Sequence, residues 1–194
     1  MRKIKMENPK ASLYPVPTSL ISCSYNNQEN IITVSWTGIM CSNPPIIYVS
    51  IRPERYSYSL ILNSKRICIN IPSIYTLNEV DFCGNTTGKA VNKELFCGFN
   101  MISLMDDYPK AIEQCKHHLL CDVFQVIELG SHTAFLAEVK HEFIDEDCFI
   151  GDHQFMYDKI QPIAYCRKEY YCLSKKIGIY GKQKTTHKDK NVLK

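Results

Sequence analysis

One short segment of the chain concentrates guanidinium, hydroxyl and aromatic groups where two expected strands end. The guanidinium groups are Arg52 and Arg55, and the aromatic group is Trp36, the only tryptophan of the 194 residues. Hydroxyl groups stand beside the arginines, at Ser50, Tyr56 and Ser57. Guanidinium and hydroxyl groups bind phosphate through charge-assisted hydrogen bonds, and an aromatic ring packs against a planar ligand. The segment therefore predicts a site for a planar molecule that carries a phosphate.

Two short strands are expected to position these groups. Residues 31–36 and 46–51 are apolar, rich in β-branched side chains and bounded by turn residues. Residues 37–43 are small and polar, and the two prolines at 44–45 disfavour a helix. We therefore expect a loop over 37–43, between the two strands.

The rest of the chain predicts more strands than helices. Further strands are expected over residues 14–25, 67–71, 119–129 and 133–143, and short helices over 54–63, 76–83 and 109–116. A five-residue turn at 26–30 and a tight turn at 130–132 create two hairpins. Thr76 and Glu79 have the spacing of a capping box. Because helices do not alternate regularly with strands, the pattern favours a β-rich α+β fold with an antiparallel barrel over a doubly wound sheet.

Length and composition are typical of one globular domain, over residues 1–173, followed by a basic tail over 174–194. No apolar run approaches the roughly 18 residues that a membrane helix needs. The N-terminus is basic but lacks the apolar stretch of a secretory signal. These features predict a cytoplasmic protein that does not bind membranes.

Positive charge is concentrated in the tail. The tail holds seven lysines and one aspartate, so the remaining residues carry a formal charge of −3 although the whole chain carries +3. A nucleic-acid-binding domain needs a basic face on the folded body. The distribution therefore argues against nucleic-acid binding as the main activity.

The ten cysteines are scattered singly, many of them inside apolar stretches, and no Cys-x-x-Cys occurs. Reduced cysteine behaves as a small apolar residue, so most of them are expected in the core. Residues 115–121 contain Cys115, His117, His118 and Cys121, and zinc binding is an alternative there. We expect no metal, because the segment straddles two expected elements and lacks a second ligand pair.

Several separate motifs resemble one known family in order and spacing. They are the Ser35–Gly38 run, Pro44–Pro45, Val49–Pro53, Cys83–Gly84, Thr87–Gly88 followed by Lys93, Leu120–Cys121 and Gly130–His132. Together they resemble the flavoredoxin group of the flavin reductase-like, FMN-binding split-barrel proteins, over roughly residues 12–150.

This resemblance implies FMN, bound without a covalent bond in a groove at a homodimer interface. Carried over to this sequence, the ring contacts would be Asn30, Ser35, Trp36, Lys93 and His132, and Tyr165 would lie against the isoalloxazine. The phosphate and ribityl contacts would be Ser50, Arg52, Tyr56 and Ser57, and Thr33 and Arg55 complete the expected set. The chain departs from the family at Tyr56, where a small hydroxyl residue is expected, and at Thr87, where serine is usual.

Lys93 and His132 have a specific expected role in this scheme. A cation beside the pyrimidine side of a flavin stabilises the reduced anion and raises the reduction potential. Without the resemblance, the same two residues would be interpreted as a solvated lysine and a turn histidine.

The sequence thus predicts an FMN-binding flavoprotein in electron transfer or flavin reduction, an FMN-dependent oxidoreductase or a pure electron carrier. The alternatives are a non-enzymatic barrel that binds a small molecule or haem, and an oligonucleotide-binding barrel. No Gly-x-Gly-x-x-Gly fingerprint is present, so the chain lacks a dedicated nicotinamide domain. NAD(P)H, a ferredoxin and another flavoprotein all remain open as the electron donor.

Overall fold

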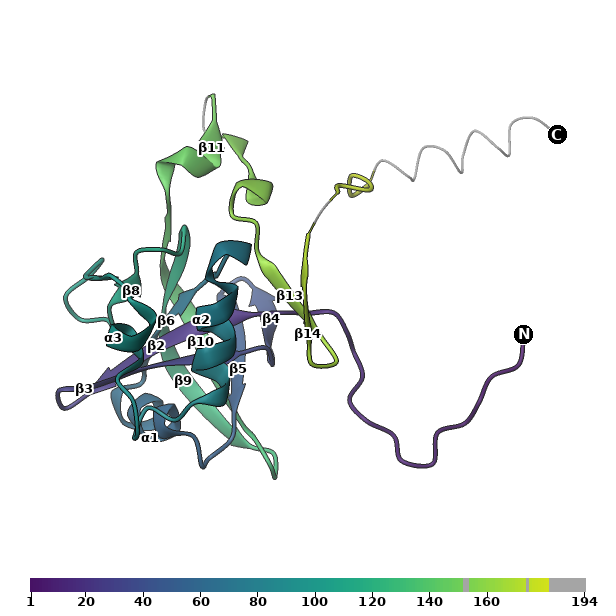
Figure 1. The fold of residues 1–194 in the computed structure, drawn as a ribbon, viewed down its shortest axis with the longest axis horizontal. Coiled ribbons are helices and arrows are strands. Elements are labelled where there is room, and N and C mark those ends of the chain that lie inside the picture. Colours follow the sequence, from purple (N-terminus) through teal and green to yellow (C-terminus); the bar gives the residue numbers. More distant parts are fainter. Residues whose placement is uncertain (152–153, 174, 182–194) are drawn as a thin grey trace.

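The computed structural model describes residues 1–151, 154–173 and 175–181, which form a β-rich fold with a few short helices (Figure 1). Its centre is one antiparallel sheet of seven strands in the order β3-β2-β6-β9-β10-β5-β4. These strands are β2 (Ser19–Tyr25), β3 (Gln28–Val34), β4 (Thr37–Ser42), β5 (Pro45–Ile51), β6 (Arg66–Asn70), β9 (His117–Glu128) and β10 (Thr133–Ile144).

The two edge strands of this sheet are consecutive in the chain. β3 lies at one edge and β4 at the other, yet only Ser35 and Trp36 separate them. The Ser50 amide of β5 donates a hydrogen bond of 2.8 Å to the Trp36 carbonyl, which ties this junction to the far edge. Since two residues span only about 7 Å even when extended, the sheet has to curl until its edges meet. The result is a barrel, as the sequence predicted.

Strand alternation divides the core between the inside of the barrel and one outer face. Ile21 and Ile32 point into the main core with Phe135, whereas Leu20 and Ile31 belong to a second buried cluster. Helix α1 (Tyr56–Ser64) contributes buried apolar residues to the main core. Helix α2 (Leu77–Asn85) covers the second cluster and packs on β3.

The smaller elements flank the barrel. They are β1 (Val16–Pro17), η1 (Ile74–Thr76), α3 (Lys93–Cys97), β7 (Met101–Ile102), β8 (Ala111–Ile112), η2 (Glu146–Cys148), β11 (Phe149–Ile150), β12 (Gln154–Phe155), η3 (Tyr157–Lys159), β13 (Ile163–Cys166) and β14 (Glu169–Cys172). β1, β13 and β14 form a separate three-stranded sheet, and the N-terminal segment before β1 runs away from the body (Figure 1). The expected basic tail lies mostly outside the described residues.

The first hairpin has a tighter turn than the sequence predicted. Instead of five residues, Asn26 and Asn27 alone connect β2 to β3, both with positive φ (48° and 59°). Two-residue hairpin turns with positive φ at both positions favour asparagine and glycine. The expectation of a turn over 26–30 was therefore wrong, and Asn30 lies inside β3 with its side chain bonded to Ser57 of helix α1.

Residues 37–43 are not the expected loop. Thr37–Ser42 form β4, which pairs with β5 through a register that contains a bulge near Met40. The Thr37 hydroxyl donates to the Tyr48 carbonyl at 2.7 Å. Small and polar residues tolerate an edge position, so tertiary pairing rather than propensity makes this strand.

Two of the helix predictions also needed correction. The expected helix over 109–116 is absent; its middle forms β8, and the Ile112 amide donates to the Asn70 side chain at 2.9 Å. Before α2, the Thr76 hydroxyl donates to the Ser73 carbonyl and does not cap the helix, so the predicted capping box does not form. The helix that follows does form, as does the one over 54–63.

The interpretation of the cysteines is confirmed for most of them. Six of the ten are buried, and all ten are free thiols. In the described part of the chain, no helix has the length and apolar character to cross a membrane.

A buried polar network joins the barrel to β8. Asn70 is fully buried, and its amide donates to the Leu20 carbonyl (2.9 Å) and the Ser22 hydroxyl (3.0 Å). Its oxygen accepts from the Ile112 amide and from His118 Nδ1, each at 2.9 Å. Burial, with a smaller contribution from neighbouring His117, lowers the pKa of His118 to about 4. His118 is therefore a neutral donor in the folded protein.

Acidification should destabilise the protein through His118. The pKa of His118 is lower in the folded state than in the unfolded chain. The stability that neutral His118 contributes is therefore fully present above pH 6.5 and is lost as the pH falls towards 4. We expect the free energy of unfolding to drop by about 3 kcal/mol over this range, as measured by urea denaturation. His118→Gln, which can donate without titrating, should remove most of this drop. His141→Gln, at an exposed position, should retain it.

Candidate functional site

Two adjoining cavities open along β3 and share Ile32, Arg52 and Arg55 in their walls. The larger, here called the aromatic groove, has a volume of about 550 Å³. It is lined by Tyr14, Ile32, Thr33, Val34, Ser35, Trp36, Ser50, Ile51, Arg52, Arg55, Asp81, Gly84, Asn85, His132, Tyr165, Lys168 and Tyr170. The smaller, here called the loop cavity, has a volume of about 440 Å³. It is lined by Asn30, Ile32, Arg52, Glu54, Arg55, Tyr56, Thr86, Thr87, Gly88 and Lys93.

Trp36 and His132 form the aromatic wall of the groove. Their ring centroids are 4.3 Å apart with an interplanar angle of 41°. Sheet pairing brings them together, because Trp36 hydrogen-bonds to β5 and His132 immediately precedes the strand that pairs with the other side of β5. Trp36 is 42% exposed, so much of its ring surface is free to contact a ligand.

His132 is held in one orientation and kept neutral. Its Nδ1 is 2.9 Å from the Ser131 hydroxyl. Partial burial, then the charge of Arg52, lowers its pKa. At neutral pH this imidazole therefore contributes a planar, uncharged surface.

Three cations face one carboxylate in each cavity. In the aromatic groove the cations are Arg52, Arg55 and Lys168, and the carboxylate is Asp81. In the loop cavity Lys93 replaces Lys168, and Glu54 replaces Asp81. Arg52 is paired with Glu54 at 3.5 Å, and both side chains are about half exposed or more. Such an exposed pair is weak, so the guanidinium can turn to an incoming anion at small cost. Arg55 precedes α1 and its side chain is exposed. The site therefore favours an anionic ligand.

Lys93 is buried, contrary to the solvated position expected without the family resemblance. It is 4% exposed, and its Nζ donates to the carbonyls of Ile31 and Cys83, each at 2.8 Å. Desolvation lowers the pKa of Lys93, and the charge of Arg55 lowers it further. An ammonium group has three donors. The third donor is free to serve the loop cavity, whose wall includes Lys93.

Asn30 links β3 to the start of α1. Its amide donates to the Ser57 hydroxyl at 2.7 Å, and Ser57 is fully buried behind it. Gly88 lies so close that a Cβ there would overlap the Asn30 oxygen and meet Tyr56 Cδ1 at 2.7 Å. Only glycine permits this approach. The loop after α2 is therefore packed directly against Asn30 and Tyr56.

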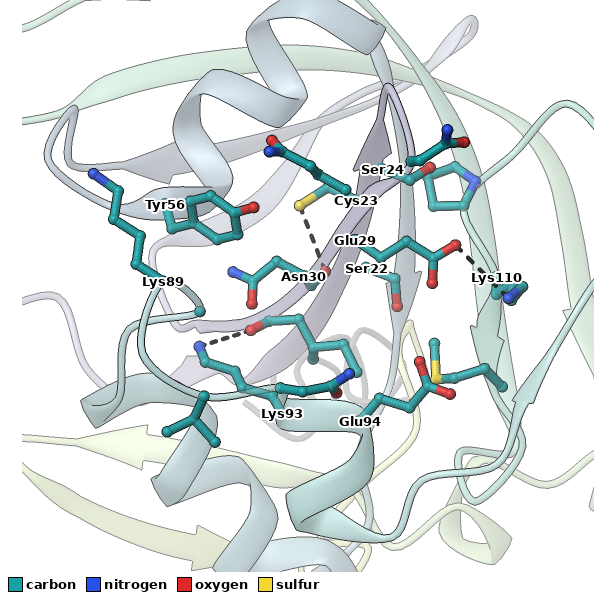
Figure 2. A pocket seen from close by; sticks show the side chains of 18 of the residues that line it. Ser22, Cys23, Ser24, Glu29, Asn30, Tyr56, Lys89, Lys93, Glu94 and Lys110 are labelled. Atoms are coloured by element: carbon teal, nitrogen blue, oxygen red, sulfur yellow. Dashed lines mark hydrogen bonds and ion pairs between the residues drawn. The ribbon is translucent and has the colours of Figure 1, made fainter.

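A third cavity of about 470 Å³ lies between the β2–β3 hairpin and the loop 88–94 (Figure 2). Asn30, Tyr56 and Lys93 line it as well as the loop cavity. At its rim Lys110 pairs with Glu29 at 3.7 Å.

The structure places the twelve predicted site residues in three positions. Eight line the aromatic groove: Thr33, Ser35, Trp36, Ser50, Arg52, Arg55, His132 and Tyr165. Asn30, Tyr56 and Lys93 line the loop cavity, where the two arginines meet them, and Ser57 lies behind Asn30. Asn30 and Lys93 are thus grouped with the arginines instead of with Trp36 and His132.

Sequence reasoning missed part of the groove wall. Besides the strand residues Ile32, Val34 and Ile51, the missed residues are Tyr14, Asp81, Gly84, Asn85, Lys168 and Tyr170. The tyrosine-rich segment 165–171 was a visible signal for Tyr170, whose ring centroid is 5.7 Å from that of Tyr165. Tertiary packing explains why position 84 is a glycine. Gly84 lies close to Thr33, and an added Cβ would meet the Thr33 Cβ at 3.3 Å.

The zinc alternative for residues 115–121 receives no support from the geometry. His117 Nε2 is 2.8 Å from Glu142, and His118 is bound to Asn70. Among the residues that the structure describes, no group of three or more histidine, cysteine or acidic side chains is placed to hold a metal.

Comparisons with known proteins agree with this geometry. The model of the "Flavin reductase like domain" family matches residues 11–174. A protein of Archaeoglobus fulgidus is 30% identical over 129 residues, which cover 66% of this chain and 72% of that protein. A protein of Pyrococcus abyssi is 24% identical over 139 residues, covering 72% of this chain and 80% of that protein.

Solved structures show the same fold. The flavoredoxin of Desulfovibrio vulgaris (Miyazaki F) matches with a TM-score of 0.85 and 24% identity, covering 93% of this chain and 98% of that one. The flavoredoxin of Methanosarcina acetivorans matches with a TM-score of 0.87 and 21% identity, covering 96% and 100%. An FMN-binding protein of Thermus thermophilus matches with a TM-score of 0.76 and 18% identity, covering 92% and 99%. The barrel is therefore the split barrel of flavin reductase-like proteins.

Lys93 should stabilise the fold as well as the site. Lys93→Met removes the donor of two backbone carbonyls, and each buried polar group left unpaired costs about 1–3 kcal/mol. Methionine has no buried charge, and avoiding the cost of burying the Lys93 ammonium offsets part of this loss of stability. We expect a net loss of about 1–3 kcal/mol in the free energy of unfolding, measured in urea. Lys89→Met, on the exposed loop, is the matched control and should change stability by less than about 0.5 kcal/mol. Equal stability of the two variants would contradict this role.

Proposed function

The chain belongs to the flavin reductase-like family, and from this premise we propose that it binds FMN and acts in electron transfer or flavin reduction. The observation that carries the proposal is the aromatic groove, where the Trp36–His132 pair and two arginines line one continuous space. A planar ring system and a phosphate need these two kinds of surface at a fixed separation.

The residues present fit such a ligand. Trp36 and Tyr165 would contact the isoalloxazine, and His132, kept neutral, would pack beside it without competing for the phosphate. Arg52 and Arg55 would bind the phosphate, because they are the cations common to both cavities. Ser35, Ser50 and Thr33 offer hydroxyl groups between the aromatic and cationic parts of the wall.

FMN, when bound, supplies the two-electron chemistry, and the protein supplies binding, orientation and electrostatics. Lys93 and Asn30 would act from the loop cavity, Lys93 through its third donor and its charge. Tyr56 takes the place of the small hydroxyl residue usual in the family and packs against Gly88.

Oxidoreductase chemistry fits the family, and we infer an FMN-dependent reaction with an external electron donor. The donor is NAD(P)H, a ferredoxin or another flavoprotein, and it would reach the flavin from the open side of the groove. A barrel that binds haem is less well supported, because in the described residues the groove-lining histidine, His132, is in contact with Trp36.

Replacing both arginines should weaken FMN binding without unfolding the protein. Charge-assisted contacts to phosphate contribute about 1.5–3 kcal/mol each, so Arg52→Ala/Arg55→Ala should raise the Kd by at least about 100-fold. The readout is quenching of Trp36 fluorescence, since this single tryptophan lies in the groove.

Riboflavin, which lacks the phosphate, is the matched ligand for this test. Its affinity should be nearly the same for the wild type and the double variant. An equal loss for FMN and riboflavin would show that the arginines act structurally. Wild-type protein that quenches with neither flavin would refute the proposed function.

We also propose that the protein is a homodimer. The chain beside the groove exposes large apolar side chains at Ile39 (82%) and Met40 (58%) of the edge strand β4, and at Trp36 (42%) just before it. An exposed apolar strand edge is usually covered by a partner. A second copy there would also cover one side of the groove.

Sedimentation of the holo protein should show a dimer at micromolar concentration. Ile39→Glu places a charge in the apolar edge and should raise the dimer dissociation constant by at least about 10-fold. Ile4→Glu is the control, because Ile4 is equally exposed (81%) but lies in the N-terminal segment away from β4. A wild-type monomer under these conditions would contradict the proposal.

A further inference from the structure

Two free cysteines meet beside the loop that lines the site. Cys83 of α2 and Cys97 of α3 have their sulfur atoms 3.9 Å apart. The preceding residues, Phe82 and Phe96, stack with ring centroids 4.0 Å apart and an interplanar angle of 8°. This stack holds the two helices in register, so the contact between the sulfurs is a property of the packing of α2 on α3.

The two thiols differ in access. Cys83 is fully buried, whereas Cys97 is half-buried and is the one a reagent can reach. Burial raises the pKa of Cys83 to about 12 and also raises the pKa of Cys97. At Cys97 the hydrogen bond from the Cys83 thiol and the charge of Lys93 offset part of this rise in pKa, and the charge of Glu79 adds to it. Cys97 is therefore the outer, attacking thiol, and Cys83 the inner one.

We propose that Cys83 and Cys97 form a reversible disulfide by exchange with a low-molecular-weight disulfide such as oxidised glutathione. The geometry carries this proposal: van der Waals contact between the sulfurs, an accessible outer thiol and a resolving thiol directly behind it. A disulfide needs a sulfur separation of about 2 Å. A small shift of the five-residue helix α3 would supply it.

The exchange balances in two steps. The Cys97 thiolate attacks one sulfur of oxidised glutathione, forms a mixed disulfide and expels one glutathione thiolate. Cys83 then loses its proton and attacks the Cys97 sulfur, which releases the second glutathione. The protein is oxidised by two electrons, and one glutathione disulfide becomes two thiols.

The new bond would close the segment 84–96 into a loop. This segment contains the groove residues Gly84 and Asn85, the residues 86–88 of the loop cavity, and Lys93. Closing it reduces the freedom of the loop that is packed against Asn30 and Tyr56. The redox state of the pair would thus control how easily the wall of the site opens.

Mass spectrometry of the full chain tests the disulfide itself. After incubation with oxidised glutathione at about pH 8, where the thiolate fraction is larger than at neutral pH, the wild type should lose two hydrogens and yield a linked Cys83–Cys97 peptide. Dithiothreitol should reverse both changes. A glutathione adduct that persists on Cys97, or linkage of Cys97 to other cysteines in equal amount, would overturn the proposal.

Single variants assign the roles. Cys83→Ala should accumulate one glutathione on Cys97, and Cys97→Ser should leave Cys83 unmodified because it is buried. Cys166→Ser is the matched control: Cys166 is half-buried like Cys97 but has no sulfur partner in the described chain. It should form the Cys83–Cys97 link as the wild type does. If Cys83→Ala fails to fold, the peptide map of the wild type still shows whether the Cys83–Cys97 disulfide forms.

The effect on the site rests on the proposed function and has a separate readout. Linked protein should release FMN at least ~3-fold more slowly than reduced protein, because a restrained loop opens less often. Equal release rates would overturn this control of the site. Absence of FMN binding in both forms would instead refute the proposed function, while the peptide map would still report on the disulfide.

Discussion

The closure of the barrel depends on the two-residue connection between β3 and β4. Because these edge strands are consecutive in the chain, Ser35 and Trp36 have to cross from one edge of the sheet to the other. The hydrogen bond from Ser50 to the Trp36 carbonyl fixes that crossing on β5. The same constraint places the tryptophan ring against His132, at the end of the paired strand β10. The aromatic wall of the groove is thus a direct consequence of how the sheet closes.

Buried polar groups then attach the surrounding helices and loops to this barrel. Lys93 ties α3 to the backbone of β3 and α2, Asn30 ties β3 to α1, and Asn70 ties β2 and β6 to β8. Such groups are costly to bury unless fully paired, so each of them specifies one arrangement. The cationic part of the site inherits its geometry from these attachments, and so does the Cys83–Cys97 contact beside it. The proposed binding site and the packing of the fold therefore share Asn30 and Lys93.

The failures of the sequence predictions have a common physical origin. Residues 37–42 lack strong strand propensity, and only pairing with β5 makes them a strand. Residues 109–116 have helical spacing, but the Ile112 amide finds its acceptor on Asn70, far away in the sequence. Lys93 would be solvated in an isolated chain, and only the meeting of β3 and α2 offers it two carbonyls. In each case a long-range partner overrode a local preference.

The sequence by itself determined the β-rich class, the long hairpin of β9 and β10, the family and the chemical types of the site residues. These features depend on side-chain alternation, turn residues and motif order, which are local properties. Only the tertiary structure decided that eight of the twelve expected residues share one groove while Asn30, Tyr56 and Lys93 line another. Only the packing of α2 against α3 brought two cysteines into contact, although thirteen residues separate them in the chain. Separation in space is set by how the sheet closes and how helices pack on it, and a linear pattern carries no direct record of either.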